Sequence, residues 1–145
     1  MTGFLRTGAV ALTVGAALAL ASSAFAETVT YKAALKAASE VPPTTSMGTG
    51  TADVTFDTVS KKLTYTITYS GLTGPATAAH FHNPAAATEN APATVPLSGA
   101  LASPVKGEAT LTDAQAADLA AGKMYFNIHT AANPGGEIRG QVTKG

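Results

Sequence analysis

The chain contains no cysteine among its 145 residues. This absence excludes disulfide bonds, a thiol nucleophile, a thiolate metal site and a lipid-modified N-terminal cysteine. A domain made from this sequence must therefore be stabilised by its hydrophobic core alone. A folded part of roughly 120 residues is long enough to form such a core.

Charged residues are also few. They make up 12% of the sequence, and nine basic residues balance nine acidic ones, so the formal net charge is zero. Nucleic acids and anionic lipids bind proteins that present a strong positive charge. The composition therefore gives no reason to expect either of them, and no nucleic acid is predicted as a partner.

A long apolar run occurs at one place in the chain, near the N-terminus. Arg6 precedes an uncharged apolar run at residues 9–21, and residues 24–26 (Ala-Phe-Ala) have the small-x-small pattern of a signal peptidase site. The run is shorter than the about 20 residues that a membrane-spanning helix needs. We therefore expect residues 1–26 to be a cleaved signal peptide, and residues 27–145 to be periplasmic or secreted without a membrane span. An uncleaved anchor is the alternative interpretation.

Alternation of apolar and polar residues dominates the rest of the chain and predicts β-strands. The clearest example is at residues 62–70, where Leu63, Tyr65, Ile67 and Tyr69 alternate with polar residues. The same pattern predicts strands at residues 28–36, 48–57, 62–70, 77–82, 124–130 and 137–142, with weaker candidates at 95–97 and 105–111.

A single short helix is predicted near residues 112–121. Thr112 and Gln115 have the spacing of a capping box, and Gly122 is suited to end the helix. Residues 83–96 are rich in Ala, Pro, Thr and Asn and are expected to form a long surface loop. Short strands with one small helix predict an all-β fold. The expected architecture is a Greek-key β-sandwich, immunoglobulin-like or Cu/Zn-superoxide-dismutase-like.

All three histidines of the chain lie on predicted strands. One residue separates His80 from His82, so both side chains project from the same side of their strand, about 7 Å apart at the backbone. His129 lies on the polar side of residues 124–130. If the two strands are neighbours in one sheet, the three imidazoles form a nitrogen site for copper or zinc with an open position for water.

Three further polar residues are candidate supporting groups for the histidines. Asn127, Glu137 and Arg139 alternate with apolar residues on the last two predicted strands. A structural alternative stays open, because strand histidines often hydrogen-bond backbone carbonyls and Glu137 can form an ion pair with Arg139. A hydrolase that uses Glu137 as acid or base is a weaker hypothesis, since neither a serine motif nor a carboxylate pair accompanies it. No catalytic residue is predicted.

Two segments of the sequence resemble a known family. Residues 78–84 (Ala-Ala-His-Phe-His-Asn-Pro) and 127–141 (Asn-Ile-His-Thr-Ala-Ala-Asn-Pro-Gly-Gly-Glu-Ile-Arg-Gly-Gln) are similar to the CHRD domain, named after chordin and found widely in exported bacterial proteins. Residues 40–43 (Glu-Val-Pro-Pro) and 69–72 (Tyr-Ser-Gly-Leu) look like earlier landmarks of the same family. The resemblance covers residues 27–145 and implies a β-sandwich without an established reaction.

The His-x-His pair also resembles the copper half of the Cu/Zn superoxide dismutases. Three histidines cannot supply both a copper site and a bridged zinc site, and the disulfide cysteines of that family are absent. This resemblance therefore implies at most a single-metal site on His80, His82 and His129.

Two hypotheses about function follow from the sequence. The first is an exported, non-catalytic CHRD-domain binding or structural module that acts outside the cytoplasm. Its functional surface is the histidine face with residues 83–96, and its partner is an unknown extracytoplasmic protein or a metal ion. The second is a mononuclear copper or zinc protein whose ligands are His80, His82 and His129.

Overall fold

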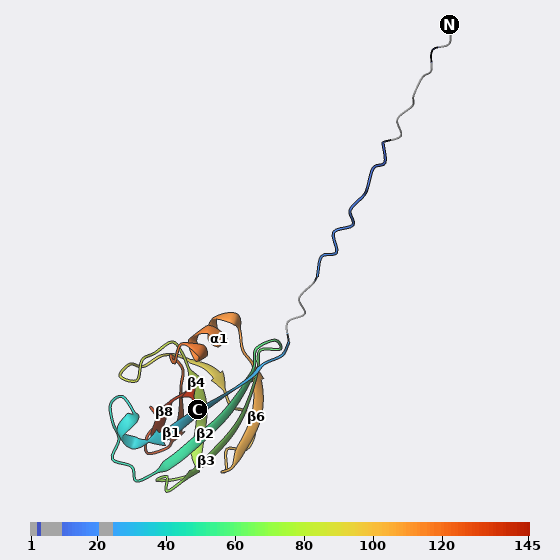
Figure 1. The fold of residues 1–145 in the computed structure, drawn as a ribbon. Coiled ribbons are helices and arrows are strands. Elements are labelled where there is room, and N and C mark those ends of the chain that lie inside the picture. The colour runs from blue at the N-terminus through green and yellow to red at the C-terminus, as the bar shows by residue number, and fades with distance from the viewer. Residues whose placement is uncertain (1–2, 4–9, 21–24) are drawn as a thin grey trace.

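The structure is a computed structural model that describes residues 3, 10–20 and 25–145 (Figure 1). Residues 10–20 are exposed and form neither helix nor strand. The expected signal peptide lies partly outside the described residues, which include neither Arg6 nor Ala24. Among the described residues, no helix is long and apolar enough to cross a membrane.

The described part of the chain is mostly β-strand, as the alternating pattern predicts. Its short helices are the 3-10 helix η1 (Ala37–Ser39) and the α-helix α1 (Asp113–Ala120). The strands are β1 (Thr28–Lys36), β2 (Thr49–Asp57), β3 (Lys62–Ser70), β4 (Ala76–His82), β5 (Ala93–Pro96), β6 (Val105–Thr110), β7 (Tyr125–Thr130), β8 (Ile138–Gln141) and β9 (Thr143–Lys144). The all-β class with one α-helix is therefore confirmed.

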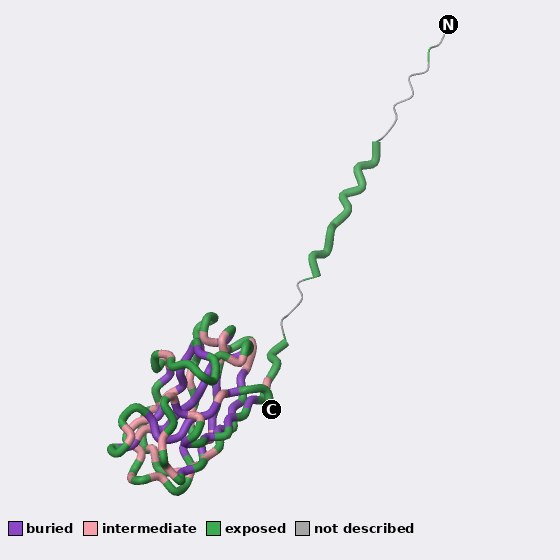
Figure 2. Tube along the Cα trace, turned by 90° about the vertical axis from the view of Figure 1, so that its left-hand side faces the viewer, coloured by how far each residue is buried: buried purple, intermediate pink, exposed green. Residues whose placement is uncertain are grey.

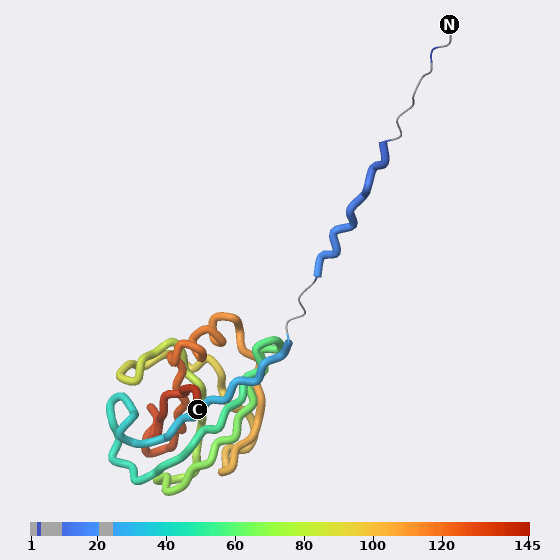
Figure 3. The backbone as a smooth tube through the Cα atoms, in the orientation of Figure 1, coloured from blue at the N-terminus to red at the C-terminus, as the bar shows by residue number. Residues whose placement is uncertain are grey.

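The strands of the described region form one nine-stranded antiparallel sheet in the order β5-β4-β7-β8-β1-β2-β3-β6, with β9 beside β1. The sheet curls so that its two halves face each other (Figures 1 and 3). Tyr65 on β3 and Phe81 on β4 show this curling, because their ring centroids are 5.7 Å apart although several strands separate β3 from β4 in the sheet order. The result is a sandwich-like fold around one core.

The core lies between the two halves of the sheet (Figure 2). On β1, β2 and β3, buried residues alternate with exposed ones, so one face of these strands packs inward and the other contacts solvent. Phe81 lies in the middle of the core with no exposed surface, and its ring is 4.8 Å from that of Phe126 on β7. Because Phe81 separates His80 from His82 in the chain, burial of its ring directs both histidines to the opposite, outer face.

Strands β7 and β8 are buried on both faces. Their outer face is covered by residues 83–92, whose backbone carbonyls accept hydrogen bonds from Tyr125 on β7 and Arg139 on β8. The expected loop at residues 83–96 is thus too long, because residues 93–96 form β5, which pairs with β4. Val95 makes this pairing favourable, since it lies opposite Phe81 and is buried.

The predicted helix is present with its capping box. The Thr112 side chain accepts a hydrogen bond from the Gln115 backbone, and the Gln115 side chain accepts one from the Thr112 backbone. The helix buries Ala116 and Leu119 against the core and is followed by Gly122 at a φ of 73°.

Candidate metal centre

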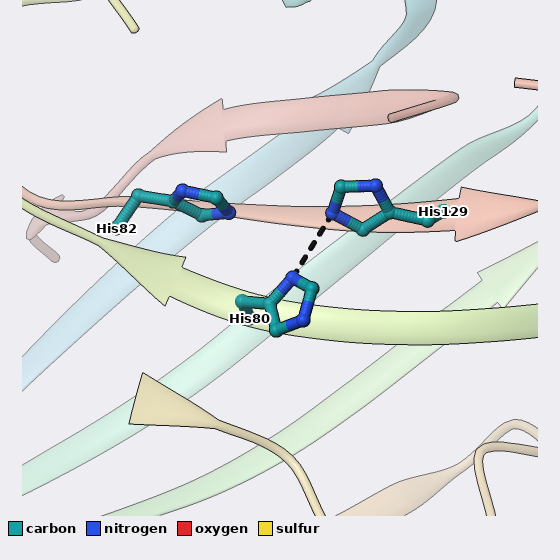
Figure 4. A group of neighbouring side chains, drawn as sticks. All are labelled: His80, His82 and His129. Atoms are coloured by element: carbon teal, nitrogen blue, oxygen red, sulfur yellow. Dashed lines mark hydrogen bonds between the residues drawn. The ribbon is translucent and has the colours of Figure 1, made fainter. Parts of the chain in front are cut away.

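The pairing of β4 with β7 brings the three histidines together. His80 lies opposite Asn127, His82 opposite Tyr125, and Ala78 opposite His129. Directly opposed residues of antiparallel strands project to the same side. The histidine ring nitrogens that could bind an ion therefore all lie within 4.8 Å of one another on the outer face of the sheet (Figure 4).

Two backbone carbonyls set the orientation of two of these rings. His129 Nδ1 is 2.9 Å from the Pro134 oxygen, and His82 Nδ1 is 2.8 Å from the Ala91 oxygen. A carbonyl oxygen can only accept, so each Nδ1 carries the hydrogen and donates it. In each neutral ring, Nε2 then has no hydrogen, and its lone pair is free to bind a metal ion. Metal-binding histidines usually have their other ring nitrogen held by such a hydrogen bond.

Both Nε2 atoms face the same oxygen. Asn127 Oδ1 is 2.9 Å from His82 Nε2 and 2.9 Å from His129 Nε2, and His80 Nδ1 is 3.0 Å from His129 Nε2. With neutral rings, a hydrogen on His80 Nδ1 bridges His80 and His129, but each Nε2–Oδ1 contact joins two lone pairs. A proton or a metal ion at the centre would relieve these contacts, and so would a turn of the Asn127 amide that exchanges Oδ1 and Nδ2.

Protons are poorly accommodated at this centre. Burial lowers the pKa of His82, and burial together with its neighbours His129 and His82 lowers the pKa of His80. Each protonated ring would place a charge in a partly desolvated site beside another histidine. The neutral, metal-binding form of His80 and of His82 is thus favoured to a pH below the ordinary histidine pKa near 6.5.

Tyr125 and Arg139 support His82 indirectly. The Tyr125 ring stacks on His82 with centroids 4.5 Å apart, and the Arg139 guanidinium lies 3.4 Å from the Tyr125 centroid. Arg139 donates hydrogen bonds to the Asn90 side chain and to the Ala86 and Glu89 carbonyls. These hydrogen bonds hold residues 83–92 over the sheet, including the Ala91 carbonyl that orients His82. Arg139 thus acts on His82 through this segment and through Tyr125.

Glu137 lies apart from the histidines, in contrast to the sequence expectation. Its carboxylate accepts hydrogen bonds from the side chains of Thr73, Thr130, Asn133 and Ser46 and from the Thr73 backbone. Burial alone would raise the pKa of Glu137, but the hydrogen bonds outweigh burial and lower it.

The expected ion pair between Glu137 and Arg139 does not form. In the described part of the chain, the ion pairs join exposed residues of β1 with β2, β3 with β6, and Lys61 with Asp113. Glu137 instead links the turn between β7 and β8 to Thr73, which lies before β4. This role is structural. The hydrolase hypothesis loses its support, because the Glu137 carboxylate is fully buried and occupied by these hydrogen bonds.

Glu40 belongs to the surroundings of the site, although the strand pattern of the sequence does not indicate it as a site residue. Its side chain is 5% exposed, and its Oε1 accepts a hydrogen bond of 3.4 Å from Asn127 Nδ2. Burial raises the pKa of Glu40 to about 7, and the hydrogen bond from Asn127 and the charge of Arg139 oppose this rise. One feature of the sequence points to Glu40. It is an acidic residue shortly before Pro42 and Pro43, in a chain with few charged residues.

Gly136 makes room for the contact between Glu40 and Asn127. A Cβ atom at residue 136 would overlap with Glu40 Oε1 and Asn127 Nδ2, and the backbone φ is 124°, a value that side chains disfavour. The glycine of the Asn-Pro-Gly-Gly turn is therefore a requirement of the site as well as of the turn.

Comparison with known proteins identifies the family of the domain. The CHRD domain profile matches residues 31–142, which include the three histidines, Asn127 and Glu40. No curated protein and no solved structure matches the chain. The resemblance of the histidine segments is thus confirmed over most of the sequence, and the chain belongs to the CHRD domain family.

Proposed function

We propose that this chain is an exported CHRD-domain protein that binds one copper or zinc ion through His80, His82 and His129. The observation that carries the proposal is the convergence of the Nε2 atoms of His82 and His129, each oriented by a backbone carbonyl behind the ring. His80 adds a third ring nitrogen from the neighbouring strand. Three imidazoles on neighbouring strands supply the ligands of a metal site, and their nitrogens, which lie within 4.8 Å of one another, move closer together when they bind one ion.

The ligand types select the class of metal. Imidazole nitrogen suits copper and zinc, whereas calcium and magnesium require several oxygen ligands. His80 and His129 are half-buried, and His82 is 8% exposed. An ion can therefore reach the site from the side of His80 and His129 while protein surrounds its other side.

The partner-binding hypothesis has less support. A protein partner would need the histidine rings or residues 83–92 as an accessible surface. Residues 86–90 are exposed and offer such a surface, but His82 is covered, and nothing in the segment indicates the chemistry of a partner. The signal-peptide pattern of residues 1–26 supports export, and an exported domain would carry the site outside the cytoplasm.

The proposal is tested by metal analysis of the purified protein. After removal of metal and dialysis against micromolar Cu(II) or Zn(II) at pH 7.5, we expect about one bound ion per chain. The ion should be released only as the pH falls below about 6.5, because the lowered pKa values of His80 and His82 keep their rings neutral down to that range. A protein that stays metal-free under these conditions contradicts the proposal.

A further inference from the structure

Asn127 Oδ1 contacts the Nε2 atoms of both His82 and His129. We propose that Asn127 Oδ1 is a fourth ligand of the ion, that the Glu40 carboxylate holds this ligand and supplies compensating charge, and that the site consequently prefers Cu(II) or Zn(II) to Cu(I). The inference rests on the proposed metal-binding function. It adds a fourth ligand to the three histidines and a preference of the site for divalent ions.

Three of the contacts among the four atoms have the spacing of ligands around one ion, whereas the widest separation among the histidine nitrogens, 4.8 Å, has to shorten when an ion binds. Ligands at 2.0–2.2 Å from zinc or copper lie about 2.9–3.5 Å apart, depending on the angle between them. Asn127 Oδ1 is 2.9 Å from the Nε2 atoms of His82 and His129, and His80 Nδ1 is 3.0 Å from His129 Nε2. An ion that binds the two Nε2 atoms therefore also meets the amide oxygen.

The surroundings fix the amide in the orientation that a ligand requires. Asn127 is 2% exposed on β7, between the core residues Phe126 and Ile128. Its Nδ2 donates to Glu40 Oε1, which leaves Oδ1 directed at the histidines. Ligands of metal sites are typically held by such an outer hydrogen bond, and Gly136 leaves the space in which this one forms.

The charge of the site explains the preference for a divalent ion. Three neutral imidazoles and a neutral amide leave the whole charge of the ion uncompensated. The buried Glu40 side chain contacts Asn127, and burial disfavours its charged form in the metal-free protein. An ion at the histidines would favour the carboxylate, and this attraction is twice as large for a divalent as for a monovalent ion. An amide oxygen is also a hard ligand, whereas Cu(I) prefers the sulfur of cysteine or methionine.

Three variants test this inference together with the wild-type protein. Asn127→Leu removes the oxygen at similar size, Asn127→Asp keeps it, and Glu40→Gln keeps an acceptor for the Asn127 amide without the charge. For each we would measure Cu(II), Zn(II) and Cu(I) affinities by competition with chelators. Electron paramagnetic resonance of the Cu(II) form reports its ligands, and the melting temperature of the metal-free form reports folding.

We expect Asn127→Leu to weaken Cu(II) and Zn(II) binding by about 10–100-fold and to change the Cu(II) spectrum. Cu(I) affinity should change less, and Asn127→Asp should retain tight Cu(II) binding. Glu40→Gln should lower the ratio of Cu(II) to Cu(I) affinity by about 10-fold while the Cu(II) spectrum keeps its nitrogen pattern.

The inference is overturned if Asn127→Leu, folded like the wild type, binds Cu(II) with unchanged affinity and spectrum. If Asn127→Leu does not fold, an unchanged Cu(II) to Cu(I) ratio in Glu40→Gln overturns it instead. In both cases, the proposed three-histidine site still stands if the wild-type protein binds one ion. A wild-type protein that binds none contradicts the proposed function itself.

Discussion

Replacing His129 with alanine is expected to weaken copper or zinc binding by more than about 100-fold, because loss of a supporting group outside the ligand shell already costs about 10–100-fold. His129 has the most central position, since its Nε2 contacts both His80 Nδ1 and Asn127 Oδ1. Its ring is half-buried and contributes little to the core. The metal-free variant should therefore melt close to the wild-type temperature.

The measurement is a competition titration with a chromophoric chelator, combined with thermal unfolding of both metal-free proteins. Thr77→Ala is the matched control, because Thr77 is exposed on the neighbouring strand β4. The control should bind the ion as the wild type does. Equal affinity of the His129 variant and the wild type would show that the ion binds elsewhere, and loss of the fold would assign the histidine a structural role.

Replacing Phe81 with alanine is expected to lower the free energy of unfolding by about 3–5 kcal/mol, a large part of the 5–15 kcal/mol typical of a domain. Phe81 has no exposed surface and contacts Phe126 and Tyr65, so its removal leaves a cavity between the two halves of the sheet. Metal binding should weaken as well, because the burial of Phe81 directs His80 and His82 outward.

Urea denaturation of the metal-free protein measures this effect, and Thr77→Ala on the same strand should change the free energy of unfolding by less than about 0.5 kcal/mol. A loss below 1 kcal/mol for the Phe81 variant would mean that β3 and β4 do not pack against each other as described.

The strands and the histidine face could be predicted because both depend on local alternation. Strand β3 has the predicted bounds at residues 62–70, and His80 and His82 share one face as their spacing requires. The approach of His129 could only be assumed, since it depends on the pairing of β4 with β7, which are more than forty residues apart in sequence.

The positions of Glu137 and Glu40 show where alternation is insufficient. Glu137 fits the pattern of the last strand, but β8 begins at Ile138, after the unusual backbone of Gly136, so the carboxylate points to Thr73 and Thr130. Glu40 lies in an irregular segment, and its contact with Asn127 joins residues 87 positions apart. The alternation of apolar and polar residues therefore predicts neither contact.

The most direct test of the metal centre is anomalous diffraction at the copper or zinc absorption edge from crystals of the loaded protein. We predict one peak per chain, about 2.0–2.2 Å from His82 Nε2, His129 Nε2 and a ring nitrogen of His80. A peak at any other place in the molecule, or no peak between these three rings, would contradict the account.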